Sequence, residues 1–109
     1  MTAQQNNPAL RAGIKAFKHG RYQQALPLLE EAAGLGALEA QRLLSRMYYA
    51  GNGVPADRER YCYWLIRAAE NGDVAAKSKL KRRYHAGELP ENLLSDPYLP
   101  RLLGKPAGR

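Results

Sequence analysis

Apolar residues recur at three- and four-residue intervals between residues 40 and 72, with polar residues between them. This spacing is typical of helices that bury one side. Gly51 and Gly53 interrupt the pattern and predict the end of a first helix, because glycine readily adopts the left-handed conformation of a helix exit. Asp57 then predicts the N-cap of a second helix, since its carboxylate can accept a hydrogen bond from a free amide. The stretch therefore predicts a helical hairpin.

Parts of this pattern recur before and after the hairpin. Phe17 and Gly20 match Tyr48 and Gly51 at an offset of 31 residues. Downstream the offset is 36 residues, and the later members of the matching pairs are Leu65, Ala68, Ala69, Gly72, Ala76, Leu80, Tyr84 and Gly87. The difference between the two offsets falls within a turn, and a turn between stacked helices can vary in length without disturbing them. We therefore predict a stack of hairpins, each burying its apolar side against the next.

Residues that typically begin or end a helix predict where the other helices lie. Pro8 suits the first turn of a helix that ends near His19. Its partner is expected at residues 22–33, where Pro27 removes one backbone donor and predicts a late start or a bend. Asp73 is placed to cap a further helix, which is expected to end near residue 86.

Two runs carry a family resemblance. The run MYYAGNGVPAD at residues 47–57, together with Trp64 and the run AAENGDVAA at residues 68–76, resembles the Sel1-like repeat, a relative of the tetratricopeptide repeat with a longer turn. The earlier run ALPLLEEAA at residues 25–33 resembles a plain tetratricopeptide unit. Tyr61 departs from the family pattern, which has alanine there, and predicts a locally spread hairpin.

The resemblance implies an all-α fold, a short right-handed α-solenoid of roughly two and a half Sel1-like or tetratricopeptide-like repeats with an irregular C-terminal cap. It also implies that the chain binds a protein or peptide in a concave groove and is not an enzyme.

The chain divides into a flexible N-terminus at residues 1–7, a repeat domain at 8–87 and a segment rich in proline and leucine at 88–109. The last segment contains four of the seven prolines, which argues against a long helix. Its leucines are nevertheless too numerous for a free tail. We therefore predict an irregular cap over the helix that begins after Asp73. A tail that reaches into a second copy and gives a weak homodimer stays open.

Composition excludes few classes of function. The chain has 109 residues, a formal net charge of +7 and a single cysteine, so no internal disulfide can form. No apolar run approaches the roughly 18 residues of a membrane span, and the first residues lack the apolar core of a signal peptide. We expect a cytoplasmic protein without a membrane partner, or a periplasmic or exported one if a signal peptide has been removed.

Catalytic and metal-binding motifs are absent from the sequence. It contains no phosphate-binding glycine loop, no nucleophile elbow and no histidine or cysteine spacing that suits a metal. His19 and His85 are expected to cap the last carbonyls of their helices, and Cys62 is expected to pack as a small apolar group. We therefore expect no enzymatic activity, no metal and no cofactor.

One charged run is not balanced by acidic residues; it comprises Lys77, Lys79, Lys81, Arg82 and Arg83. Such a run is most often a solvated helix face, but its single sign favours an anionic partner. Alignment of the first helices of the hairpins predicts a groove whose partner-binding residues are Gln41, Ser45, Tyr48, Tyr49, Lys77, Lys81, Tyr84 and His85. Lys77 and Lys81 share a side of their helix because they are four residues apart.

The predicted groove grades from apolar to basic, since Leu10 and Ile14 stand in the columns of Lys77 and Lys81. This gradient favours an acidic peptide or an acidic surface of a folded partner. The lysine pair resembles the basic pair with which some tetratricopeptide domains grip an acidic C-terminus. Leu10 and Ile14 depart from that pattern, so only part of such a carboxylate clamp is present.

Two other functions stay open. The positive charge and Tyr84 could contact nucleic-acid phosphates and bases, although no nucleic-acid motif appears. Alternatively, the protein could be structural, with the groove filled by its own tail or by a second copy.

Overall fold

The computed structural model describes residues 7–103. Within them it is all-helical and contains no strand, so the predicted fold class is confirmed at that level. The elements are α1 (Pro8–Lys18), α2 (Tyr22–Gly34), α3 (Leu38–Ala50), α4 (Arg58–Glu70), α5 (Val74–His85), the 3-10 helix η1 (Glu91–Leu93) and α6 (Tyr98–Leu103). The predicted flexible N-terminus lies, except for Asn7, outside the described residues, as does the end of the chain at 104–109.

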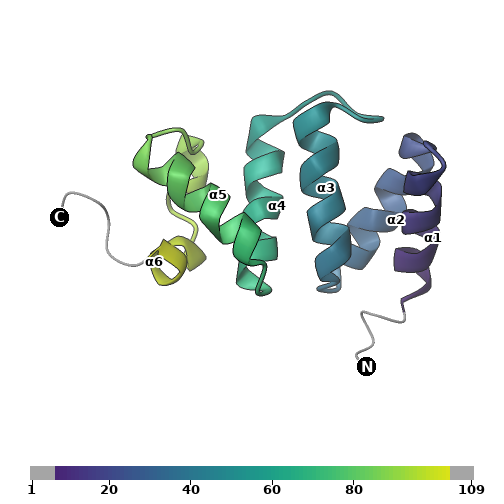
Figure 1. Ribbon diagram of the computed structural model, residues 1–109, viewed down its shortest axis with the longest axis horizontal. Coiled ribbons are helices and arrows are strands. Elements are labelled where there is room, and N and C mark those ends of the chain that lie inside the picture. Colours follow the sequence, from purple (N-terminus) through teal and green to yellow (C-terminus); the bar gives the residue numbers. More distant parts are fainter. Residues whose placement is uncertain (1–6, 104–109) are drawn as a thin grey trace.

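The first five helices follow one another in space as they do in the sequence. Each of them packs against the next, and α1 also reaches α3. Figure 1 shows them arranged along the longest dimension, with α1 at one end and α6 near the other. The molecule measures 45 × 32 × 19 Å along its principal axes. Because each helix packs mainly against the helices next to it in the sequence, one long side of each helix stays accessible to solvent and to partners.

The core runs through all of these helices. Its largest fully buried side chains are Leu29, Leu44, Met47, Ile66, Leu80 and Cys62. Small residues accompany them: Ala32 and Ala33 on α2, and Ala68 and Ala69 on α4, are all buried. Their short side chains allow neighbouring helices to approach closely, which places more apolar surface out of contact with water.

The helix ends follow the predicted capping chemistry. The Asp57 carboxylate accepts a hydrogen bond from the Arg60 amide at 3.1 Å, and Asp73 accepts one from the Ala75 amide at 3.1 Å. Gly51 ends α3 in the left-handed conformation, with φ of 77°. These three predictions are confirmed.

The helix α2 begins at Tyr22, as the predicted range of residues 22–33 has it, five residues before Pro27, and continues through the proline. Of the two effects expected from Pro27, the late start is therefore wrong. Pro27 lies on the exposed side of α2. The carbonyl that lacks a helical partner can therefore be satisfied by water, and tertiary packing of the opposite side of α2 offsets the local cost.

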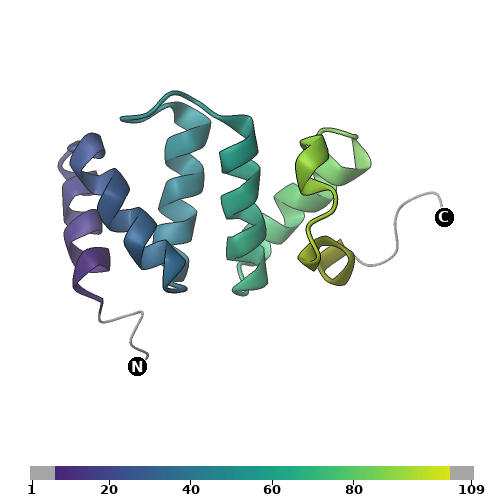
Figure 2. The same ribbon diagram turned by 180° about the vertical axis from the view of Figure 1, so that it is seen from behind.

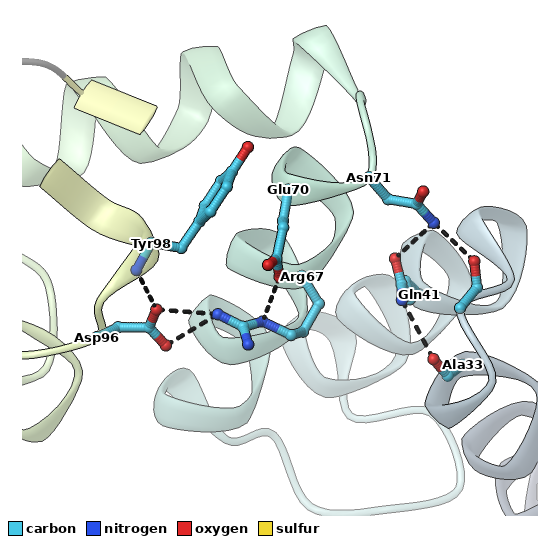
Figure 3. Close-up of polar contacts among 8 residues, drawn as sticks. Ala33, Gln41, Arg67, Glu70, Asn71, Asp96 and Tyr98 are labelled. Carbon is cyan, nitrogen blue, oxygen red and sulfur yellow. Dashed lines mark hydrogen bonds and ion pairs between the residues drawn. The ribbon is translucent and has the colours of Figure 1, made fainter. Parts of the chain in front are cut away.

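A short polar network connects three helices at one edge of the stack. The side-chain amide of Gln41 donates to the Ala33 carbonyl at 3.1 Å. Asn71, which follows α4, donates to the Gly36 carbonyl at 2.7 Å and to Gln41 Oε1 at 3.4 Å (Figure 3). The network satisfies the buried Gln41 side chain and links α2, α3 and the end of α4.

The segment after α5 folds back onto α4 and α5. Its buried leucines are Leu89, Leu93, Leu99 and Leu102. Both η1 and α6 contact α4, and α6 also contacts α5. Figure 2 gives the view from behind, in which this segment is coloured from yellow-green to yellow. Arg67 on α4 donates from Nη2 to both carboxylate oxygens of Asp96 at 2.9 Å, and Asp96 in turn accepts from the Tyr98 amide (Figure 3). Apolar burial and this ion pair therefore hold residues 88–103 against the preceding helices.

Cys62 is fully buried, which confirms that it packs as a small apolar group. Burial raises the pKa of the Cys62 thiol, an effect that the nearby Arg83 and Arg58 partly offset. We expect the native protein to react with a thiol-specific aromatic disulfide at least about a hundredfold more slowly than the urea-unfolded chain, because the reagent must wait for an opening of the structure. Absorbance of the released thiolate measures this rate. A native rate near that of the unfolded chain would contradict the burial.

Candidate functional site

A pocket of about 800 Å³ opens between α3 and α5, with α4 at its base. The helix α3 contributes Ser45, Arg46 and Tyr49 to its lining, and α5 contributes Lys79, Arg82 and Arg83. Further lining comes from Phe17, Ala50, Asn52, Tyr61, Ala86 and Glu88. We call this site the α3–α5 pocket.

Aromatic rings provide the apolar part of the α3–α5 pocket. Tyr61 on α4 is buried, with 7% of its surface exposed, and its ring centroid lies 5.0 Å from that of Tyr49. Tyr49, on the last turn of α3, is 66% exposed. Phe17 forms another part of the lining. An exposed aromatic side chain beside a buried one offers contact area that a partner can cover.

Four cationic side chains surround these rings. The spacing of Lys79, Arg82 and Arg83 places them on one side of α5, since residues three and four apart lie on the same face. Arg46 on α3 approaches them from the opposite wall of the α3–α5 pocket. Along residues 7–103, no ion pair joins Arg46, Lys79 or Arg82 to a carboxylate. The pocket therefore carries positive charge that the described residues do not neutralise.

Two of the cations stack on aromatic rings. The Arg83 guanidinium carbon lies 5.0 Å from the centroid of the Tyr61 ring, and that of Arg46 lies 5.9 Å from the centroid of Phe17. A guanidinium held over an aromatic face retains its hydrogen-bond donors along its edges. Both arginines are thus oriented while their donors stay accessible to an anion.

Three residues of the predicted groove, Gln41, Ser45 and Tyr48, are buried, and Gln41 and Tyr48 also bond to neighbouring helices. The Gln41 amide belongs to the polar network described above. Tyr48 is 3% exposed, and its hydroxyl donates to the Glu30 carboxylate at 3.0 Å. Burial and, to a smaller extent, the hydrogen bond to Glu30 raise the pKa of Tyr48. Both side chains therefore make internal contacts between helices.

The other predicted residues divide between two sides of α5. Ser45 and Tyr49 line the α3–α5 pocket. Tyr84 and His85, whose rings lie 5.7 Å apart, line a separate pocket of about 340 Å³ together with Gly87, Leu89 and Leu94. The structure thus brings the tyrosine–histidine pair together but not with Tyr49.

Lys77 and Lys81 are exposed and lie outside the lining of the α3–α5 pocket. An α-helix turns by about 100° per residue, which places both lysines on the side of α5 opposite Lys79 and Arg83. The sequence alignment placed Lys77 and Lys81 in the groove because residues in one column of aligned repeats point the same way from each helix. A pocket between two neighbouring helices is instead lined by the sides that face each other, and the two lysines do not lie on such a side.

Sequence reasoning missed Arg46 altogether and did not separate Lys79 and Arg82 from the rest of the charged run. A signal was present: Arg46 and Arg82 match at the offset of 36 residues, and Lys15 precedes Arg46 by the shorter offset of 31. This column is cationic on α1, α3 and α5. Because this column directly follows that of Ser45, a predicted groove residue, it could have been identified as part of the same site.

The structure provides little that resembles a metal or membrane site. Among the described residues, no group of three or more histidine, cysteine, aspartate or glutamate side chains could hold a metal ion. No described helix has both the length and the apolar character needed to cross a membrane.

The Nδ1 atom of His19 lies 2.9 Å from the Lys15 carbonyl oxygen, which confirms its predicted capping contact at the end of α1.

No protein-family model matches this chain, and no solved structure matches it. The function is therefore argued from the geometry and charge of the α3–α5 pocket.

Proposed function

We propose that the protein is a non-enzymatic interaction module that binds an acidic peptide, or an acidic surface of a folded protein, in the α3–α5 pocket. The observation that carries this proposal is a set of three cations around the exposed ring of Tyr49, namely Arg46, Lys79 and Arg82, none of which forms an ion pair with another described residue. Carboxylates of the partner would neutralise the cations, and an apolar side chain would cover the ring.

We infer that the helices form a short right-handed α-solenoid of roughly two and a half Sel1-like or tetratricopeptide-like hairpins. Support comes from the 36-residue offset in the sequence and from the packing of each helix against the next. Further support comes from the glycines that follow the first five helices with positive φ: Gly20, Gly36, Gly51, Gly72 and Gly87. In such an array the first helices of the hairpins, α1, α3 and α5, share one side, which is the side of the α3–α5 pocket.

Long-range attraction and short-range contacts would act at different stages of binding. The uncompensated charge raises the rate of encounter with an acidic partner, an effect that salt screens over about 10 Å at moderate ionic strength. Exposed ion pairs contribute only about 0.2–1 kcal/mol each, so lasting affinity depends on apolar contact with Tyr49 and Phe17. The proposed ligand therefore carries several carboxylates and at least one large apolar side chain.

The test compares two double variants that remove the same charge from the two sides of α5. We expect Lys79→Ala/Arg82→Ala to weaken binding of Asp/Glu-rich peptides containing one phenylalanine by about tenfold, because two ion pairs are lost. The matched control, Lys77→Ala/Lys81→Ala, changes net charge equally outside the pocket and should leave affinity nearly unchanged. Fluorescence anisotropy with a labelled peptide library measures both.

Three results would contradict the proposal. Equal affinities for both double variants and the wild type would exclude the α3–α5 pocket. A loss confined to Lys77→Ala/Lys81→Ala would place the site on the other side of α5. Binding of a single-stranded oligonucleotide with steeper salt dependence and higher affinity than any peptide would favour nucleic acid as the ligand.

A further inference from the structure

Among the described residues that line the α3–α5 pocket, Glu88 is the only one with a carboxylate. Its Oε1 atom lies 3.8 Å from Nη1 of Arg83. The Glu88 side chain is 56% exposed, whereas that of Arg83 is 25% exposed. The chain thus places one of its own acidic groups at the mouth of the pocket, next to a cation held inside it.

The backbone turn after α5 determines this position. Gly87 adopts φ of 71°, the Gly87 amide donates to the Tyr84 carbonyl at 3.1 Å, and the Glu88 amide donates to the Arg83 carbonyl at 2.8 Å. This pair of hydrogen bonds defines the Schellman helix end, in which the residue after the glycine lies next to the residue five positions earlier. The turn therefore brings Glu88 beside Arg83 whatever their side chains are.

The corresponding turn after α2 has apolar residues at both of these positions. There the Ala37 amide donates to the Ala32 carbonyl at 3.1 Å, and both alanines are buried. Two apolar residues in contact are the common arrangement at such a helix end. After α5 the same two positions hold a glutamate and an arginine, which contribute charge to the pocket in place of apolar contact.

The pair between Glu88 and Arg83 is weak enough to exchange. A separation of 3.8 Å is longer than a charge-assisted hydrogen bond, which spans about 2.7–2.9 Å. Arg83 is positioned independently by its stacking on the Tyr61 ring, with 5.0 Å between its guanidinium carbon and the ring centroid. Releasing Glu88 therefore leaves the guanidinium in place with free donors.

We propose that Glu88 is a built-in competitor, which occupies the position of a ligand carboxylate on Arg83 and must be displaced when a partner binds that arginine. The inference rests on the proposed function and adds a specificity element to it. A ligand with one carboxylate can pair with Arg46, Lys79 or Arg82 and leave Glu88 in place. A ligand with enough carboxylates to reach all four cations must displace Glu88, so Glu88 lowers the affinity for the most acidic partners.

The experiment compares Glu88→Gln with the wild type and with Glu31→Gln. Glutamine retains the backbone amide and the size of the side chain, so the helix end is preserved. Glu31 is exposed on α2 and lies outside the pocket lining, so its substitution removes the same charge elsewhere. The probes are a short Glu-rich peptide containing one phenylalanine, and its counterpart with all glutamates but one replaced by glutamine. Calorimetric titration measures both affinities.

We expect Glu88→Gln to bind the multiply acidic peptide about threefold to fivefold more tightly than the wild type, since Glu88 no longer competes for Arg83. The gain for the singly acidic peptide should be smaller, and Glu31→Gln should bind both peptides as the wild type does. The preference for the multiply acidic peptide over the singly acidic one therefore rises in Glu88→Gln alone.

The failures of the two proposals are distinguishable. If the wild type binds the multiply acidic peptide and Lys79→Ala/Arg82→Ala weakens that binding, but Glu88→Gln changes neither affinity, only the competitor role is overturned. An equal gain in Glu31→Gln likewise overturns it, because net charge would then explain the effect. If neither the wild type nor Glu88→Gln binds either peptide, the proposed function and the competitor role fall together.

Discussion

Replacing Gly53 by alanine is expected to destabilise the protein by at least about 3 kcal/mol. Gly53 lies in the loop between α3 and α4 with φ of 72°, a left-handed conformation that costs most other residues about 1–2 kcal/mol. An added Cβ would also lie 2.6 Å from the Tyr22 Cβ and 2.9 Å from its carbonyl carbon. Backbone atoms at the start of α2 cannot move aside without disturbing that helix, so the two costs add.

Urea unfolding followed by circular dichroism measures the effect. Gly34→Ala is the matched control: Gly34 is the last residue of α2, and no neighbouring atom lies within 4 Å of an added Cβ. Alanine there should leave stability unchanged or raise it by up to about 1 kcal/mol. A Gly53→Ala protein as stable as the wild type would show that the loop does not rest against α2 in solution.

Replacing Leu99 or Leu93 by alanine is expected to cost about 2–3 kcal/mol, because each leaves a cavity beneath the C-terminal segment. The two side chains are 3% and 8% exposed, respectively. Leu94 provides the control, since it is adjacent in sequence but 48% exposed, and Leu94→Ala should cost less than about 0.5 kcal/mol. Deleting residues 88–109 should destabilise the chain more than any of these substitutions, because it removes the Asp96 partner of Arg67 as well.

The same unfolding measurements test this prediction. Comparison of Leu93→Ala with Leu94→Ala is the sharper test, since the two variants have identical composition. Equal stability of the two, or a deletion protein as stable as the wild type, would show that residues 88–103 do not cover α4 and α5. Light scattering across concentrations adds a separate check, because a tail exchanged between copies would make the average molar mass rise with protein concentration.

Local chemistry made the helix ends predictable from the sequence. Asp57 and Asp73 cap α4 and α5 because a carboxylate just before a helix meets free amides wherever the helix lies. Gly51 ends α3 for a similarly local reason, its tolerance of positive φ. Pro27 is the exception, since packing of the buried side of α2 outweighs a defect that would matter in an isolated helix.

The pattern of apolar and polar residues was enough to predict that the chain is helical, where most of its helices begin and end, and which strip of α5 is buried. On α5 that strip contains Ala76 and Leu80, and cations lie on both sides of it. Which of those two flanks faces α3 depends on how α5 packs against α4, and no property of α5 alone reveals it. The packing directs Lys79 and Arg82 into the α3–α5 pocket and leaves Lys77 and Lys81 outside it.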